Sequence, residues 1–115
     1  METIIYHNPA CGTSRKVLER LQNASVSLTV IEYLKTPLTK NDLHKLISHL
    51  SVPVRDIIRE RGTPYDELGL DNDALTDDEL VEAIAKHPIL LNRPIVVSDK
   101  GAKLCRPAEL VEELI

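Results

Sequence analysis

The sequence contains almost no aromatic residues. Tryptophan and phenylalanine are absent, and the three tyrosines, Tyr6, Tyr33 and Tyr65, make up 3% of the 115 residues. Because 43% of the chain is nevertheless hydrophobic, we expect a core built from aliphatic side chains. A nucleic-acid surface that stacks bases on aromatic rings is not expected.

Basic charge is also in deficit. The chain has 14 Lys and Arg against 18 Asp and Glu, which leaves a formal net charge of −4. A general polyanion binder is normally basic, so nucleic acid is not expected as a partner. The balance still permits a small anion site, because salt limits the reach of distant charges to about 8 Å and a few local arginines can dominate a pocket.

Long apolar runs are missing as well, so no membrane-spanning segment is expected. Met1–Thr3 leads straight into a predicted strand, which leaves no room for a signal peptide. We therefore expect a cytoplasmic protein whose two cysteines, Cys11 and Cys105, are reduced. The four histidines are scattered, and none pairs with a cysteine at the spacing of a zinc site.

The first third of the chain predicts a β-α-β unit. Thr3–His7 is rich in β-branched residues and stops at Asn8-Pro9, which is typical of a strand. A helix should follow, and Ser27–Tyr33 should form a second strand, parallel to the first because a helix connects them. Three apolar residues at helical spacing should lie on one face of that helix: Val17, Leu18 and Leu21.

The middle of the chain, about residues 38–88, predicts a helical insert. Thr39 and Thr76 each precede an acidic residue by three positions, as in a capping box. Pro53 suits the start of a further helix, and residues 63–73 are rich in turn formers. The residues expected on the buried faces of these three helices are Leu43, Leu46, Ile47, Leu50, Val54, Ile57, Ile58, Leu80, Val81 and Ile84.

The last part of the chain predicts two strands and a helix. Pro94–Val97 and Ala102–Leu104 should be the strands, joined by a hairpin turn at residues 99–101. Pro107 suits the first position of the helix, whose buried face would carry Leu110, Val111 and Leu114. Residues 1–115 therefore predict one α/β domain with a mixed four-stranded sheet, in the order β-α-β, helical insert, β-β-α.

Cys11 lies where the first strand hands over to the first helix. The unpaired N–H groups and positive dipole end of a helix N-terminus favour a thiolate. A shift of the thiol pKa to about 6.5 would leave roughly three-quarters of it ionised at neutral pH. Arg15, four residues on, and His7, at the end of the strand, are placed to help.

Cys11 could be either a reactive thiol or a buried, inert cysteine, and buried cysteines are common. The flanking Asn8, Gly12, Thr13 and Ser14 are loop and cap residues, which favours a reactive thiol. Ser14 stands where a Cys-x-x-Cys motif would have its second cysteine, so dithiol exchange within this motif is excluded. Arg15 follows Cys11 by four residues rather than the six of a tyrosine-phosphatase loop, which disfavours that reading.

The segment from His7 to Arg15, HNPACGTSR, closely resembles the active-site segment of the glutaredoxin-coupled bacterial arsenate reductases. The resemblance runs in order through almost the whole chain, and its other segments are YDELGL (65–70), HPILLNRPIVV (87–97) and LCRP (104–107). It implies a thioredoxin-like fold with a helical insert, which agrees with the predicted order of elements. It also implies a cis peptide bond between Arg93 and Pro94.

The resemblance implies a role for each matching residue. Cys11 would attack arsenate and form a thiol–arsenate adduct, and His7 would help to keep the thiol ionised. Glutathione would join the adduct as co-substrate, glutaredoxin would resolve the mixed disulfide, and no metal or bound cofactor would take part. The arginines expected to hold the oxyanion are Arg59, Arg93 and Arg106, with Arg15 as a further candidate.

Plainer readings stay open at this point. Arg59 lies in a charge-rich stretch with Arg55 and Arg61, Arg106 could cap the last helix, and Cys105 reads as a packed thiol in a strand. A different thiol redox enzyme on the same fold is one alternative function. A regulator that binds RNA polymerase is another, although it would not need three anion-binding arginines.

Overall fold

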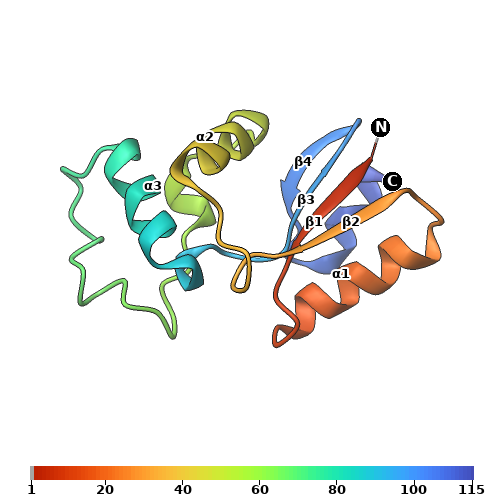
Figure 1. Ribbon diagram of the computed structural model, residues 1–115, viewed down its shortest axis with the longest axis horizontal. Helices are drawn as coiled ribbons and strands as arrows, with labels where there is room; N and C mark the ends of the chain where they lie inside the picture. The colour runs from red at the N-terminus through yellow and green to blue at the C-terminus, as the bar shows by residue number, and fades with distance from the viewer. Residues whose placement is uncertain (1) are drawn as a thin grey trace.

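A four-stranded mixed sheet forms the centre of the computed structural model, which describes residues 2–115 (Figure 1). The strand order is β2-β1-β3-β4; β1 pairs in parallel with β2 and antiparallel with β3, and β3 pairs antiparallel with β4. The predicted mixed sheet is therefore confirmed. Its strands are β1 (Thr3–His7), β2 (Leu28–Glu32), β3 (Ile95–Ser98) and β4 (Gly101–Leu104).

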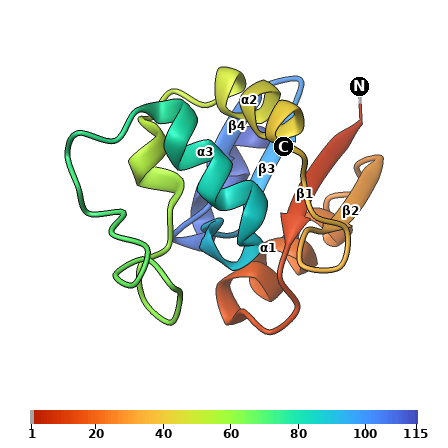
Figure 2. The same ribbon diagram turned by 60° about the vertical axis from the view of Figure 1, so that its left-hand side comes forward.

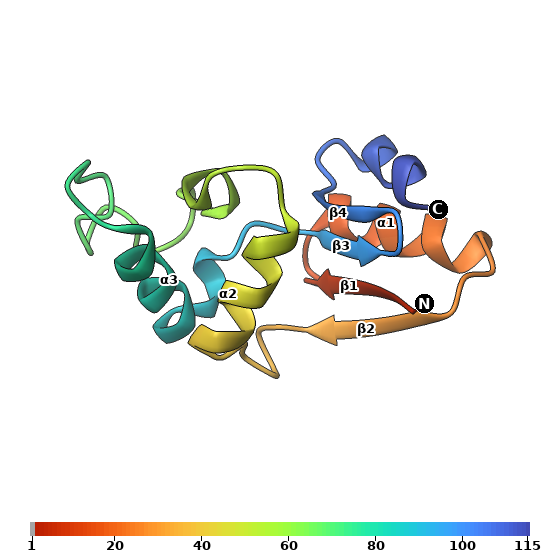
Figure 3. The same cartoon turned by 90° about the horizontal axis from the view of Figure 1, so that it is seen from above.

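One face of the sheet is covered by α1 (Gly12–Asn23) and η3, a 3-10 helix over Ala108–Leu114 (Figure 3). Residues alternate between the two faces of a strand, so Ile5 of β1 and Val96 of β3 face these helices. They form an aliphatic cluster there with Val17, Leu21, Cys105, Ala108, Val111 and Leu114.

The helical insert between β2 and β3 extends from one end of the sheet (Figure 2). Both expected capping boxes are formed: Thr39 Oγ1 accepts the N–H of Asp42 at 3.0 Å, and Thr76 Oγ1 accepts that of Glu79 at 3.2 Å. The second core cluster joins the insert to Tyr33 and β3. The insert consists of α2 (Lys40–His49), η1 (Val54–Ile57), α3 (Asp77–Lys86) and η2 (Pro88–Leu90).

Two of the expected helices are 3-10 helices. The one after Pro53 is a single turn, and Ile58 lies beyond it in an antiparallel bridge to Leu91. In the last one Pro107 is the N-cap rather than the first residue. A 3-10 helix has three residues per turn, so its buried positions are Ala108, Val111 and Leu114, and the expected burial of Leu110 was wrong: it is only half-buried.

The hairpin differs slightly from the prediction. Gly101 pairs with Ser98 and belongs to β4, so the turn is Asp99-Lys100. Gly101 has φ of 132°, a conformation that favours glycine. Cys105 follows β4 instead of lying in it.

Four chain segments meet at the edge of the sheet that faces the insert. β1 and β2 run in parallel and both end there. β3 runs the other way, so it begins there, with Ile95 opposite Tyr6 and Leu104. The cis Arg93–Pro94 bond that precedes β3 confirms the prediction, and Arg106–Pro107 is also cis, which was not predicted. This end of the sheet therefore collects the residues after β1, after β2, before β3 and after β4.

No helix in residues 2–115 has both the length and the apolar character needed to cross a membrane.

Arg55 organises the turn-rich loop of the insert. Its Nη1 donates to the carbonyl oxygen of Leu70 at 2.8 Å and to the hydroxyl of Tyr65 at 3.4 Å. Its Nη2 donates to the carbonyl oxygen of Asn72 at 2.8 Å. One side chain thus satisfies three acceptors that lie 10 to 17 residues away in the sequence.

We expect Arg55→Leu to lower the free energy of unfolding by about 1–3 kcal/mol, because it leaves the partly buried carbonyl of Leu70 without its donor. Urea denaturation followed by circular dichroism measures the change. Arg61→Leu is the matched control, since Arg61 is exposed and its loss should cost no more than about 0.5 kcal/mol. Equal stabilities of the two variants would contradict the role given to Arg55.

Candidate active site

Cys11 is the N-cap residue of α1 and follows β1 by four positions. Its thiol is buried, with 8% of the residue exposed. The loop before it is a tight turn, because the N–H of Cys11 donates to the carbonyl of Asn8 at 3.0 Å and the side-chain oxygen of Asn8 accepts the N–H of Ala10 at 2.9 Å. The turn fixes the direction in which the thiol leaves the backbone.

Ser14 supports this loop from inside. It is fully buried, and its Oγ accepts the N–H of Asn8 at 3.1 Å. The same Oγ is hydrogen-bonded to Nδ1 of His7 at 2.6 Å. The expectation that Thr13 or Ser14 caps the helix was wrong: Cys11 holds the N-cap position, because the helix already begins at Gly12.

The surroundings of Cys11 lower the pKa of its thiol below the ordinary value. Burial alone raises it, since burial disfavours the charged form. The backbone N–H of Ser14, the charge of Arg93 and a hydrogen bond from Arg106 together outweigh that effect. Nη1 of Arg106 lies 3.7 Å from the sulfur. The arrangement therefore favours a thiolate at the N-terminus of α1.

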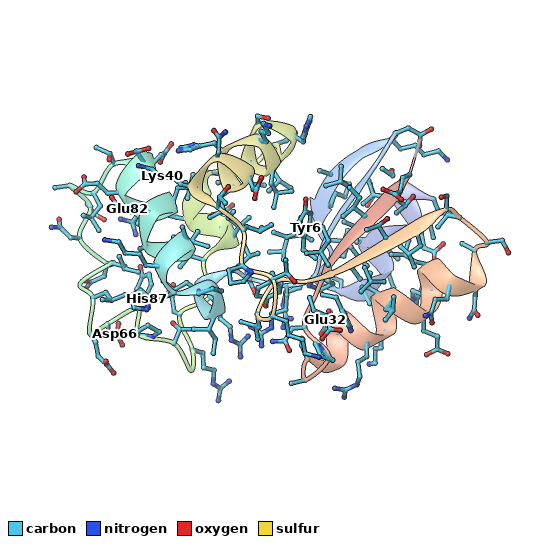
Figure 4. All side chains as sticks on the ribbon, viewed as in Figure 1. Tyr6, Glu32, Lys40, Asp66, Glu82 and His87 are labelled. Carbon is cyan, nitrogen blue, oxygen red and sulfur yellow. The ribbon has the colours of Figure 1, made fainter. Side chains whose placement is uncertain are left out.

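Three arginines lie near the thiol, and Arg106 contacts its sulfur. Nη1 of Arg106 donates to the carbonyl of Arg93 at 3.1 Å, which holds the two residues together. The pKa of Arg59 is lowered, first by burial and then by the charges of Arg93 and Arg106, so all three guanidinium groups are close. In Figure 4 nitrogen-bearing side chains gather at this junction of sheet and insert, between the labelled Glu32 and His87.

Arg93 carries a free donor. Its Nε is buried and, within residues 2–115, has no hydrogen-bond partner. Buried donors are normally satisfied, so an orphan beside two other cations is typical of a site for an anion. Nε of Arg59, by contrast, donates to the carbonyl of Arg61 at 2.8 Å.

The structure separates Arg59 from Arg55. Arg55 is held by the loop of the insert, whereas Arg59 feels the charges of Arg93, Arg106 and Cys11. The fold therefore places Arg59, Arg93 and Arg106 near the thiol, as the resemblance implied. Their part in binding an oxyanion stays a prediction.

Arg15 is not among the groups that lower the pKa of Cys11. Its guanidinium is exposed and donates to the carbonyl of Pro9 at 2.9 Å. The sequence interpretation in which Arg15 supplies the cation for the thiolate is corrected here, because Arg93 and Arg106 supply it. Arg15 does lie in the first turn of α1, close to Cys11 along the helix, but its side chain turns back toward Pro9 in the loop before Cys11.

His7 is buried, and its pKa is lowered. Burial is the main cause and the charge of Arg15 adds to it, while Glu32 opposes both. An imidazole whose pKa lies below its ordinary value of about 6.5 is largely neutral at neutral pH. His7 is thus connected to the thiol through Ser14 and not as an adjacent imidazolium.

The second cysteine has the opposite environment. Cys105 is fully buried in the aliphatic cluster under α1, and burial raises the pKa of its thiol to about 12. Its Sγ contacts the carbonyl of Lys103 at 3.6 Å. A neutral, covered thiol is a poor nucleophile, which agrees with its reading as a packing residue.

The sequence pattern of the ArsC family matches residues 6–114. The chain belongs to the ArsC family. This ArsC-family chain is 51% identical to the arsenate reductase of Escherichia coli strain K12 over 111 residues, which cover 96% of the chain and 79% of that relative. It is 49% identical to the arsenate reductase of Rhizobium meliloti over 115 residues, which cover 100% of the chain and 82% of that relative.

A solved structure has the same fold. The arsenate reductase of Vibrio cholerae superposes on this structure with a TM-score of 0.94 at 40% sequence identity. The match covers 100% of this ArsC-family chain and 98% of the Vibrio cholerae chain. The thioredoxin-like fold expected from the sequence is confirmed by this likeness.

One residue beside the site was missed by the sequence interpretation. Tyr33 is 1% exposed, and its hydroxyl donates to the carbonyl of Leu91 at 3.3 Å, two residues before Arg93. A signal existed: Tyr33 is one of three aromatic residues and comes directly after β2, at the same edge of the sheet as Cys11.

Iodoacetamide should alkylate Cys11 with a pH midpoint below the ordinary value of about 8.5, because the thiolate fraction rises with pH and the lowered pKa moves that rise to lower pH. Arg106→Leu should move the midpoint upward by about one pH unit. Peptide mass spectrometry after alkylation measures both and should find Cys105 unlabelled in the folded protein.

Arg61→Leu is again the control, since Arg61 is not among the groups that shift the thiol pKa. A midpoint that is the same in all three proteins would show that the arginines do not stabilise the thiolate.

Proposed function

We propose that this ArsC-family protein is an arsenate reductase that reduces arsenate to arsenite with electrons from glutathione. The observation that carries the proposal is a thiol of lowered pKa, 3.7 Å from the guanidinium of Arg106, with the charges of Arg59 and Arg93 beside it. The names of the relatives, about half of whose matched residues are identical, support the choice of arsenate.

Binding would use the arginines. A thiolate and an arsenate dianion repel each other, so cationic donors must neutralise charge before they can meet. Planar guanidinium groups suit this because each offers several N–H donors to a tetrahedral oxyanion. The buried Nε of Arg93 would gain the acceptor that it lacks among the described residues.

In the first step Cys11 would attack arsenic. The thiolate sulfur forms an S–As bond and one As–O bond breaks. The leaving oxygen departs as water after it takes up the proton of HAsO₄²⁻ and one proton from solvent. Arsenic stays pentavalent in this adduct. Arg59, Arg93 and Arg106 would stabilise the negative charge on the remaining oxygens, and His7 and Ser14 would hold the loop that aims the sulfur.

In the second step glutathione would supply the electrons. Its thiolate attacks the sulfur of Cys11, an S–S bond forms, and the electron pair of the S–As bond stays on arsenic, which becomes trivalent. With the protons of solvent the product leaves as arsenous acid. A second glutathione, with glutaredoxin as the partner protein, would then reduce the mixed disulfide and restore the thiol. The proposed cycle uses no metal and no bound cofactor.

An assay coupled to NADPH oxidation tests the proposal. Purified protein is mixed with arsenate, glutathione, glutaredoxin and glutathione reductase, and the loss of NADPH absorbance is followed. We expect arsenate-dependent turnover that disappears in Cys11→Ser, because an alcohol at this position is a far weaker nucleophile. Cys105→Ser is the matched control and should retain turnover. Turnover that survives Cys11→Ser, or a wild type without turnover, would contradict the proposal.

Arg93→Ala should lower kcat/KM for arsenate by roughly 10²-fold, as expected when a donor to a developing oxyanion is removed. Steady-state rates over a range of arsenate concentrations measure the change. Arg61→Ala serves as the comparison, since Arg61 is an exposed arginine near the same site. Equal rates for the two variants would mean that the anion binds elsewhere.

A further inference from the structure

Residues 90–94 connect to each of the three arginines. The carbonyl of Leu90 accepts the N–H of Arg59 at 2.7 Å. The N–H of Asn92 donates to the carbonyl of Ile57 at 2.8 Å, and Ile58 and Leu91 form a bridge between these bonds. The backbone of Arg59 is thereby tied to the segment that carries Arg93.

Arg106 depends on the same segment. Its Nη1 donates to the carbonyl of Arg93, and the N–H of Cys105 donates to the carbonyl of Pro94 at 2.9 Å. A displacement of residues 90–94 would therefore move all three guanidinium groups relative to the thiol. The thiol itself belongs to another part of the chain, the loop after β1.

Tyr33 joins these two parts. Its hydroxyl donates to the carbonyl of Leu91. Its backbone follows Glu32, which pairs with His7 at the start of the loop that leads to Cys11. Burial, the largest effect, raises the pKa of Tyr33 above its ordinary value, so the phenol keeps its proton and can donate at neutral pH. The residue follows β2, which pairs with β1 along its full length.

We propose that Tyr33 is a positioning residue of the anion site, and that its hydroxyl holds residues 90–94, and through them Arg59, Arg93 and Arg106, against the Cys11 loop. It acts on the anion site through Leu91 and through the pairing of β2 with β1, so it is a positioning residue and not a catalytic one. The inference rests on the proposed function for the identity of the anion, but the placement of the arginines can be tested without arsenate.

Tyr33→Phe keeps the ring in the core and removes only the hydroxyl. We expect kcat/KM for arsenate to fall about tenfold, the equivalent of one lost hydrogen bond. The pH midpoint of Cys11 alkylation should rise at the same time, because Arg93 and Arg106 are then held less firmly beside the sulfur. A residue with a purely packing role would leave that midpoint unchanged.

Tyr65→Phe is the matched control. Tyr65 is also buried and also loses one hydroxyl contact, to Arg55 at 3.4 Å, but it is in the loop of the insert. It should leave both kcat/KM and the thiol midpoint at wild-type values. Thermal unfolding of both variants checks their folding; if Tyr33→Phe is too unstable, both readouts are taken in sucrose at low temperature, since sucrose favours the folded state.

The proposal is overturned if Tyr33→Phe matches Tyr65→Phe in both readouts. A wild type that fails to turn over arsenate would reject the proposed function alone. In that case the alkylation midpoint still decides the role of Tyr33, because iodoacetamide needs no anion site.

Discussion

The antiparallel pairing of β3 with β1 is the constraint on which the site depends. It places the residues before β3 beside the residues after β1, so the carbonyls and N–H groups of residues 90–94 lie within reach of the Cys11 loop. Those backbone groups then hold Arg59 through Leu90 and Arg106 through Arg93. The backbone of Arg59 and the guanidinium of Arg106 are thus both held by hydrogen bonds to main-chain carbonyls of this segment.

The charges at this edge are balanced against burial. Burial by itself would keep the Cys11 thiol protonated, and it is overcome by the N–H of Ser14 and by Arg93 and Arg106. The arginines in turn repel one another: burial is the main cause of the lowered pKa of Arg59, and the charges of Arg93 and Arg106 add to it. An arriving anion would relieve that repulsion and satisfy the buried Nε of Arg93. The same arginines can therefore stabilise the thiolate and attract the anionic substrate, because the thiolate and the substrate are both negatively charged.

Features with a local cause were predictable. The capping boxes at Thr39 and Thr76 depend on residues three positions apart, and both formed as expected. The strands followed from short β-branched runs, and the position of Cys11 followed from the junction of a strand and a helix. The 3-10 helix over Ala108–Leu114 was not distinguished from an α-helix, because apolar residues recur every three or four positions in both, and only packing against α1 chooses between them.

The sequence by itself determined that a thiol would stand at a helix N-terminus with no second cysteine in its motif, since both depend only on the order of neighbouring residues. Tertiary structure decided which charges reach that thiol. Arg15 is near in sequence but turns toward Pro9, while Arg93 and Arg106 are far in sequence and lie beside the sulfur. The physical reason is that a side chain's direction depends on what packs around it, and strand pairing, not sequence distance, brings residues 93 and 106 to the end of β1.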